Sequence, residues 1–313
     1  MFLILMLYMT FASTFTIAKA ALSYTTPIFL IAIRMLIGGG LLLMYQYWCD
    51  YKHWRFSWSD IGLLAQVSFF EYYTAFIFEC WALQWVSSSK ACLIFNLSPF
   101  VTAIISFFMF KERLTWKKRI GLAIGFLGFI PIIRATAAQE NIGGSLFGIS
   151  MPEISLLAAV FCASYGWIVL REMQRRGYAI VMINGLTMTT AGFGALITSF
   201  LLEGLPVITP PQGCLGGALP VLCNNIGVYG AGIVMFMIYT MSLVVLAHII
   251  GFNLYGYLLN RYSATFISFA GFVTPLFAAL FGWIFLCEDI GNSFFLTTAI
   301  VFVGLLLFYQ DEL

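Results

Sequence analysis

Ionisable side chains deep inside long apolar stretches are the residues of this sequence that could do chemistry. Glu71 lies eleven residues into one such stretch, about 16 Å along a helix. His248 lies inside another. Because such groups are costly to bury in hydrocarbon, the pair either holds a cationic or amphipathic substrate or exchanges a proton with it. The other interpretation is packing, with Glu71 protonated or hydrogen-bonded and His248 a satisfied core histidine.

Three more charged side chains lie within apolar stretches. Arg34 needs a partner, which is either a carboxylate such as Glu71 or an anionic group of a substrate. Glu79 and Lys90 flank a short turn and lie five or six residues from it. We expect these two to pair, either as a structural salt bridge or as an ion pair that opens as an outer gate.

Aromatic residues are also candidates for substrate binding, since they make up 18% of the chain, more than interfacial belts alone require. Tyr73 and Phe76 lie between Glu71 and Glu79 in the same stretch. A ring beside a carboxylate binds an organic cation by charge and cation–π attraction, and it also stacks on a base. Most of the other rings are expected to pack against lipid or neighbouring helices.

Two prolines occupy matching positions in their stretches. Pro99 and Pro275 each lie twelve residues in, where proline removes a backbone hydrogen bond and leaves a carbonyl group free. We expect a hinge at each proline, with Asn96 and Ser98 as polar partners in a substrate site. Bundled helices also tolerate proline without any such role.

The elements that must position these residues are predicted to be membrane helices. Hydrophobic residues make up 62% of the chain and charged residues 9%, and the mean hydropathy is +0.97, unlike a soluble domain. The first stretch is interpreted as a retained helix, because it has no basic n-region and no cleavage site. Stretches of about 17 to 25 apolar residues span a bilayer. Ten are predicted, at 1–20, 27–48, 60–84, 87–110, 118–134, 152–171, 180–202, 231–258, 263–287 and 292–309.

The sequence repeats itself at an offset of 176 residues. Nine residues recur without a gap, and those of the first copy are Leu83, Ser87, Pro99, Ala103, Glu112, Ala123, Ile124, Phe126 and Gly128. The same offset places His248 at the position of Tyr72. Duplicated membrane bundles are typical of transporters whose site lies between the halves.

The distribution of basic residues predicts the orientation. Loops after the second, fourth, sixth and eighth stretches hold Lys52, Arg55, Lys111, Arg113, Lys117, Lys118, Arg119, Arg171, Arg175, Arg176 and Arg261. These loops and both termini are expected to be cytoplasmic. Five spans per half is an odd number, so the second half is expected to be inverted. The halves are predicted at 1–134 and 152–313, with an outer linker at 135–151.

Several function classes are excluded. The sequence holds no paired-His metal motif, nucleophile elbow or phosphate-binding glycine loop, so it predicts no enzyme, metal, cofactor or nucleotide-driven pump. The net charge of +2 comes from the basic loops and implies no nucleic-acid partner. The expected partners are a small-molecule substrate and the lipid bilayer, for a monomer or a homodimer.

Cys214 and Cys223 share the long outer loop and are either paired or free. One helix face is either a close-packing surface or a dimer contact, and it carries Gly121, Gly125 and Gly128.

At this point the residues resemble a family. Residues 82–131 read ALQWVSSSKACLIFNLSPFVTAIISFFMFKERLTWKKRIGLAIGFLGFIP and resemble the second half of an EamA domain of the drug/metabolite transporter superfamily. Residues 262–304 resemble the same pattern, with Ser/Thr-Pro and then Glu thirteen residues later, and 27–40 resemble the family's second helix. The resemblance implies ten helices in two inverted repeats, with alternating access around a central cavity. Residues 152–202 match poorly, and 287–289 depart from the basic 111–113.

The combined prediction is a secondary transporter of small organic metabolites in a bacterial inner membrane. Members of the family include amino-acid exporters and carriers of nucleoside-bearing metabolites such as S-adenosylmethionine. The acidic, aromatic third stretch suits a substrate that joins positive charge to a ring, so an exchanger of such a substrate is the leading hypothesis. The alternatives are an amino-acid or drug exporter, a lipid-linked flippase or intramembrane enzyme with Glu71 and His248 as acid and base, and a non-transporting receptor or scaffold.

Overall fold

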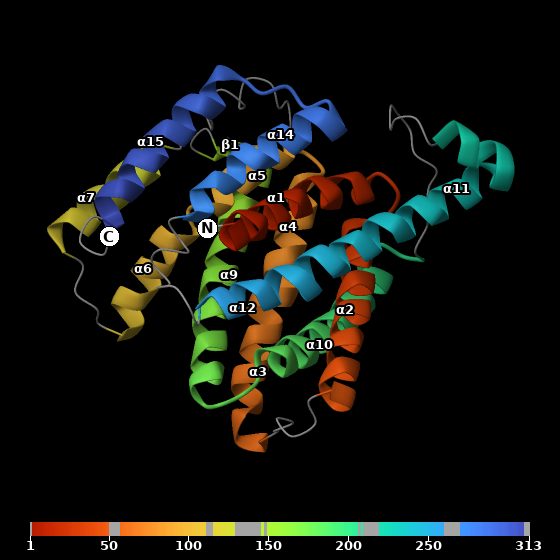
Figure 1. Cartoon of the computed structure of the whole chain (residues 1–313), viewed down its shortest axis with the longest axis horizontal. Helices are drawn as coiled ribbons and strands as arrows, with labels where there is room; N and C mark the ends of the chain where they lie inside the picture. Colours follow the sequence, from red (N-terminus) through yellow and green to blue (C-terminus); the bar gives the residue numbers. More distant parts are fainter. Residues whose placement is uncertain are drawn as a thin grey trace.

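The structure is a computed structural model, and it describes residues 2–49, 57–110, 115–128, 145, 146, 149–205, 208, 219–259 and 270–309 (Figure 1). For some residues named in the sequence analysis, either the whole residue or its side chain lies outside the described part of the chain. They are Lys52, Arg55, Lys111, Glu112, Arg113, Lys118, Cys214, Cys223 and Arg261.

The first half of the chain begins with three long helical runs. Helix α1 (Phe2–Leu22) is followed by α2 (Pro27–Cys49), whose proline occupies the first turn, where its missing N–H breaks no helical bond. The third run, Trp58–Leu83, is continuous but changes its winding. Its parts are η2 (Trp58–Asp60), α3 (Ile61–Val67), the π-helical segment η3 (Ser68–Thr74) and α4 (Ala75–Leu83).

The fourth run of the first half is broken near its middle. Two residues separate the end of α5 (Ser88–Phe95) from the start of α6 (Ser98–Phe110), and Pro99 lies in the first turn of α6. Because proline cannot donate a backbone hydrogen bond, the helix restarts there. Helix α7 (Trp116–Leu127) follows.

The second half opens on a short hairpin of β1 (Ser145–Leu146) and β2 (Ile149–Ser150). A capping box between Ser150 and Glu153 then starts α9, in which Glu153 Oε2 accepts from the Ser150 N–H at 2.7 Å. The remaining elements are α9 (Met151–Arg175), α10 (Ile180–Leu202), α11 (Leu219–Leu243), the π-helical η4 (Val244–Gly251), α12 (Phe252–Leu259), η5 (Gly271–Val273), α14 (Thr274–Leu286) and α15 (Asn292–Tyr309).

Seven helical runs among the described residues are long and apolar enough to cross a membrane. Two shorter apolar runs, Gly271–Leu286 and Asn292–Gly304, and helix α7 coincide with the other three predicted spans. Seven of the ten predicted spans therefore coincide with helical runs of membrane-spanning length among the described residues, and the count of ten spans stays a prediction.

The helices pack in pairs and threes (Figure 1). Helix α2 lies along α10, and α7 lies along α15. Helix α9 packs against α4 and α6, whereas α1 packs against α14 and α11. One buried apolar cluster surrounds Leu93 and Phe100, and a second surrounds Met35 and Tyr72.

Irregular segments occur at matching positions of the two halves. The π segments η3 and η4 begin at Ser68 and Val244, which are 176 residues apart, the same offset as in the sequence repeat. The break before Pro99 has a counterpart in η5, immediately before Pro275. Both predicted proline positions therefore coincide with a change in helical winding, as a proline inside a helix requires.

Candidate functional site

Glu71 lies in η3, near the middle of its run, and is only 3% exposed. It rests against a glycine of α9, since a Cβ at Gly166 would lie 2.5 Å from Glu71 Cβ and 2.8 Å from its Oε2. Within the described part of the chain, Oε2 is buried without a hydrogen-bond partner. Gly166 thus leaves the space in which the carboxyl group sits.

His248 lies in η4 and is fully buried among rings. It stacks on Phe252, with ring centroids 5.8 Å apart, and meets the edge of Phe76 at 6.4 Å. A Cβ at Gly38 of α2 would lie 3.1 Å from His248 Cδ2, so the imidazole also packs closely on α2. Neither ring nitrogen has a hydrogen-bond partner among the described residues. The described residues therefore supply none of the hydrogen bonds that a satisfied core histidine would make.

Arg34 contacts the ring of Phe76, which His248 also contacts. Its guanidinium carbon lies 4.4 Å from the centroid of Phe76, and its Nη2 lies 3.7 Å from Cys80 Sγ. The side chain is 2% exposed, and Nε has no partner in the described chain. The structure gives Arg34 an aromatic face in place of the carboxylate partner Glu71, with which it forms no ion pair among the described residues. A cation–π contact supplies part of the stabilisation that a buried cation requires.

The two tyrosines beside Glu71 face different helices. Tyr72 stacks on Phe76 and donates to Asn184 Oδ1 of α10 at 2.9 Å. Tyr73 turns elsewhere, because its hydroxyl lies 2.6 Å from Thr198 Oγ1 and its ring stacks on Phe69. Of the two predicted aromatic contacts, Phe76 therefore joins the buried cluster, whereas Tyr73 packs on α10.

The helix break before Pro99 is polar as predicted. Asn96 caps the end of α5, and its Nδ2 is buried without a partner in the described chain. The hydroxyl groups of Ser98 and Ser164 lie 3.1 Å apart and join α6 to α9. Pro275 is buried at the start of α14. The structure thus places Asn96 beside a break of the kind that forms sites in transporters.

Lys90 pairs with a residue from the second half of the chain. Its Nζ lies 2.8 Å from Glu153 Oε1, and both side chains are at least 97% buried. Glu153 is thus an ion-pair partner of Lys90, and the expected pairing of Lys90 with Glu79 stays a prediction. Glu79 is buried, and the positive charge of Arg34 acts on its carboxyl group.

Glu288 forms a second tie, which the sequence analysis missed. Its carboxylate lies 3.0 Å from Lys19 Nζ and accepts from both the backbone N–H and the hydroxyl of Ser88 at 2.8 Å. Cys287 adopts a left-handed conformation with φ of 52°, which costs a non-glycine residue about 1 to 3 kcal/mol. A Cβ at Gly282 would lie 2.5 Å from Glu288 Oε2. The ends of α1, α5 and α14 are therefore held together.

Glu203 plays a comparable part at the start of α2. Its carboxylate accepts from the backbone N–H groups of Ile28 and Phe29, at 2.9 and 3.1 Å, and from the hydroxyl of Thr26 at 2.6 Å. An acidic side chain here complements the positive end of the helix dipole. The capping box of Glu153 was visible in the sequence, but nothing in the spacing connected Glu203 to α2.

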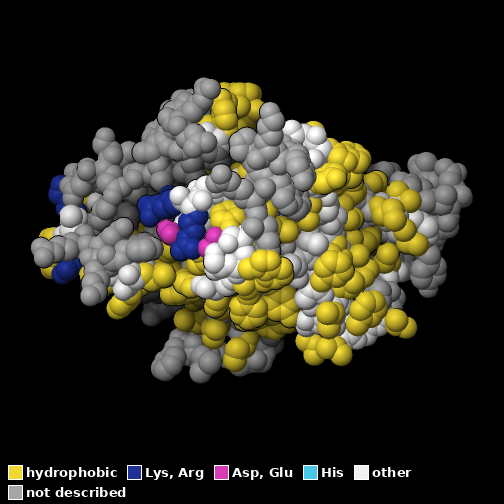
Figure 2. Space-filling model, turned by 90° about the horizontal axis from the view of Figure 1, so that it is seen from below, with side chains coloured by type: hydrophobic (Ala, Val, Ile, Leu, Met, Phe, Trp, Pro, Cys, Tyr) yellow, Lys and Arg dark blue, Asp and Glu magenta, His cyan; other side chains and the backbone are white. Residues whose placement is uncertain are grey.

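A third polar group lies at the end where α3 begins and α9 ends. Asp60 Oδ1 lies 2.6 Å from Arg176 Nη1, and Tyr178 donates to Asp60 Oδ2 at 2.7 Å. Desolvation and then this hydrogen bond raise the pKa of Tyr178 above its ordinary value, so the phenol stays protonated. Figure 2 shows basic and acidic side chains gathered among hydrophobic ones on this face.

Gly128, which follows the last residue of α7, packs against α15. A Cβ at Gly128 would lie 2.9 Å from Ile300 Cγ2 of α15, so this position belongs to a helix contact within the chain. Among the described residues, no group of three or more His, Cys, Asp or Glu side chains is placed to hold a metal.

Comparison with known proteins gives the family. Residues 1–134 and 150–310 match the EamA-like transporter family. The chain is 30% identical over 320 residues to a protein of Chlamydia muridarum named S-adenosylmethionine/S-adenosylhomocysteine transporter, with 99% of this chain and 92% of the relative covered. A protein of the same name from Chlamydia trachomatis serovar D is also 30% identical, with 99% and 89% covered.

The fold is shared with a solved structure. A crystal structure at 17% identity superposes with a TM-score of 0.61 and covers 98% of this chain and 93% of that one. Together with the apolar helices, these matches identify an all-α integral membrane protein. The chain belongs to the EamA-like transporter family of the drug/metabolite transporters, and it is a secondary transporter rather than an enzyme.

Proposed function

We propose that this protein exchanges S-adenosylmethionine for S-adenosylhomocysteine across a bacterial inner membrane. The names of the two chlamydial relatives, which align over nearly the whole chain, support the substrate pair. Exchange is favoured because S-adenosylhomocysteine is what remains when S-adenosylmethionine has donated its methyl group. Import of S-adenosylmethionine and export of S-adenosylhomocysteine therefore supply and clear the same methyl-transfer reactions.

A group of buried polar atoms carries the proposal. Within the described chain, Arg34 Nε, Glu71 Oε2, Asn96 Nδ2 and both ring nitrogens of His248 lack hydrogen-bond partners. An unsatisfied buried polar group costs about 1 to 3 kcal/mol, and more when it is charged. These four were predicted from the sequence as substrate contacts, and a ligand that bonds to them would remove that cost.

The chemistry of the substrate matches these groups. The sulfonium and amino groups of S-adenosylmethionine are cationic and suit the carboxylate of Glu71. The carboxylate of the substrate suits Arg34, whose guanidinium already lies over Phe76. The adenine ring suits the aromatic cluster of Phe76, His248 and Phe252. Asn96 offers an amide donor for the purine nitrogens.

The exchange would move charge. S-Adenosylmethionine carries one more positive charge than S-adenosylhomocysteine at neutral pH, because a sulfonium becomes a thioether. A membrane potential contributes about 2.3 kcal/mol per charge per 100 mV. A negative interior therefore drives uptake of the methylated form in exchange for the demethylated one, without a coupling ion.

We further propose that two inverted five-helix halves alternate around this site. The equal spacing of η3 and η4 supports the repeat, as does the packing of α2 on α10 and of α7 on α15. The end that carries Asp60 and Arg176 is assigned to the cytoplasm, which places both termini there. The ties made by Glu288 and Glu153 then lie at the outer end, where the tie between Glu288 and Lys19 of α1 would open as a gate.

Counterflow in proteoliposomes tests the function. Vesicles loaded with unlabelled S-adenosylmethionine or S-adenosylhomocysteine should accumulate labelled S-adenosylmethionine, and faster when the interior is made negative with valinomycin. The variant Glu71→Gln should raise the apparent KM about 10- to 100-fold, because a charge-assisted contact is lost. Glu172→Gln is the matched control, since this glutamate is exposed at the end of α9.

The other outcomes separate the alternatives. Accumulation only in vesicles loaded with aromatic or branched amino acids would make the protein an exporter of the commoner family type. An unchanged KM in Glu71→Gln would remove the site assignment but not the transport activity. Silence with every solute would contradict the proposal and favour a lipid-linked flippase.

A further inference from the structure

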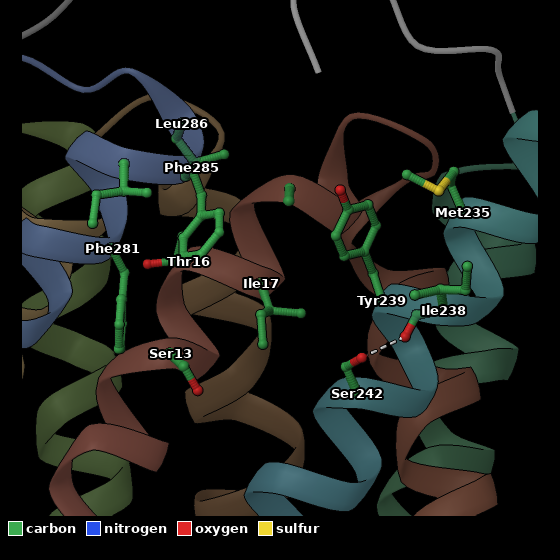
Figure 3. A pocket seen from close by; sticks show the side chains of 12 residues that line it. Ser13, Thr16, Ile17, Met235, Ile238, Tyr239, Ser242, Phe281, Phe285 and Leu286 are labelled. Atoms are coloured by element: carbon green, nitrogen blue, oxygen red, sulfur yellow. Dashed lines mark hydrogen bonds between the residues drawn. The ribbon is translucent and has the colours of Figure 1, made fainter. Parts of the chain in front are cut away.

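A cavity of about 480 Å³ lies between α1, α11 and α14 (Figure 3). It is separate from the buried cluster around Phe76, whose residues do not line it. Its size falls in the range of small-molecule sites, about 300 to 1,000 Å³. Its walls come from both halves of the chain, which is where transporters bind their substrates. The lining residues are Ser13, Thr16, Ile17, Ala20, Met235, Ile238, Tyr239, Ser242, Phe281, Ile284, Phe285 and Leu286.

Hydroxyl groups give this cavity hydrogen-bonding capacity. Thr16 is 4% exposed, and its Oγ1 has no partner in the described chain, so it is free to donate and accept. Ser13 and Ser242 already donate to the carbonyl groups of Thr10 and Ile238, and their oxygens remain available as acceptors. The three hydroxyl groups come from two helices that face one another across the cavity (Figure 3).

Rings supply the rest of the lining. Phe281 and Phe285 lie one turn apart on α14 with centroids 6.3 Å apart, and Tyr239 faces them from α11. No charged side chain is among the lining residues. The site therefore suits an uncharged group with a flat face and several hydrogen-bonding atoms. A lipid acyl chain fits the cavity poorly, because it offers no hydrogen bond to the Thr16 hydroxyl. The hydroxyl groups of a ribose can form such a bond and so remove the cost of leaving Thr16 unsatisfied.

We propose that this cavity is an entry site that binds the nucleoside part of the incoming substrate before the substrate reaches the aromatic cluster of Phe76 and the charged groups of Glu71 and Arg34. The inference rests on the proposed function for the identity of the base. Ser242 lies six residues before His248 on one continuous run, about 9 Å along the helix. In the proposed orientation the cavity occupies the outer half of the membrane, so it meets an incoming substrate before the buried cluster does.

Binding of labelled adenosine to the purified protein in phosphatidylcholine nanodiscs tests the cavity. Adenosine lacks the sulfonium, amino and carboxylate groups that pair with Glu71 and Arg34, and the variants of Thr16 and Phe285 distinguish its binding in this cavity from binding at the aromatic cluster of Phe76. Thr16→Val, which keeps the shape and removes the hydroxyl, should weaken binding about fivefold. The matched control is Thr14→Val, because this threonine is on the same helix, bonds to the carbonyl of Phe11 and does not line the cavity. Phe285→Leu removes an exposed ring and should weaken binding about tenfold.

Two results separate this inference from the proposed function. Glu71→Gln should leave adenosine binding intact while it impairs exchange. If the wild-type protein binds adenosine through Thr16 but does not exchange S-adenosylmethionine, the cavity stands and the proposed function fails. If exchange is normal and adenosine either does not bind or binds equally to Thr16→Val and Phe285→Leu, the inference is overturned, and a lipid chain becomes the better occupant.

Discussion

The three-helix group around α9 and the three-helix group around α1 are built differently. Helix α9 packs on α4 and α6 and is tied along its length by Glu153 to Lys90, Ser155 to the carbonyl of Phe78, and Ser164 to Ser98. Helix α1 packs on α11 and α14 and is tied at one end by Lys19. The most apolar stretch of α9 is 56% buried, against 39% for α1.

The difference indicates that the α9 group and the α1 group have different roles. Polar ties distributed along a helix fix its position, whereas ties confined to one end leave the middle free to separate and hold a cavity. The α9 group therefore provides the rigid wall against which Glu71 is placed. The α1 group provides the part that can open, and substitutions in the two groups should affect different quantities.

The largest effect is expected from Lys90→Met in the α9 group. It leaves Glu153 buried without its counter-ion, and breaking a buried pair costs about 3 to 5 kcal/mol. Thermal unfolding in detergent should show a large fall in Tm. The double variant Lys90→Met with Glu153→Gln should recover part of it, because the amide carries no charge yet still accepts from Ser150. Equal loss in both variants would contradict the role of the ion pair.

A smaller but clear loss is expected from Gly166→Ala. The added methyl group would overlap Glu71 Cβ, and overpacking typically costs about 1 to 3 kcal/mol. Gly40→Ala is the matched control, because nothing lies within 4 Å of a Cβ there, and it should be neutral or stabilising. Unfolding curves that coincide for the two variants would show that Gly166 does not form the wall behind Glu71.

Lys19→Met in the α1 group should cost about 1 kcal/mol or less, since the lysine side chain is 27% exposed and solvent screens its pair with Glu288. Lys19→Arg should keep wild-type stability. The comparison between the groups fails if Lys19→Met lowers Tm as much as Lys90→Met does.

The smallest effect on stability is expected from Thr16→Val. Removing a buried hydroxyl that has no hydrogen-bond partner among the described residues should be neutral or stabilise the fold by up to about 1 kcal/mol. A differential scanning measurement should therefore show no fall in Tm, even as adenosine binding weakens. Marked destabilisation would mean that Thr16 serves packing and not a ligand.

Burial and element type were predictable from the sequence, whereas partners were not. Apolar length fixed the helices, and depth within a stretch correctly gave Glu71, His248 and Arg34 as buried. Sequence proximity suggested Glu79 for Lys90, but it could not suggest Glu153, an ion-pair partner that only tertiary packing brings close. The Arg34 contact with Phe76 was missed because only anionic partners were considered, either a carboxylate such as Glu71 or a group of the substrate.

The π-helical winding of η3 and η4 also could not be predicted from the pattern of hydrophobic residues. Hydrophobic periodicity does not distinguish an α-helix from a helix that contains a π segment, so it gave no indication of η3 or η4. Only the two prolines gave a local signal of irregularity. The offset of 176 residues, by contrast, pointed to the equivalence of the regions in which both π segments occur.

The π segments give the ring cluster a means of rotation. In such a segment each backbone bond reaches one residue further than in an α-helix, so one extra residue is accommodated. Phe76 follows η3 by two residues, and Phe252 follows η4 by one. If either segment rewound as a regular α-helix, the residues after it would swing by about 100° about the helix axis. Phe76 would then leave the guanidinium of Arg34, and a shift of single hydrogen bonds would reorient the rings without moving a whole helix.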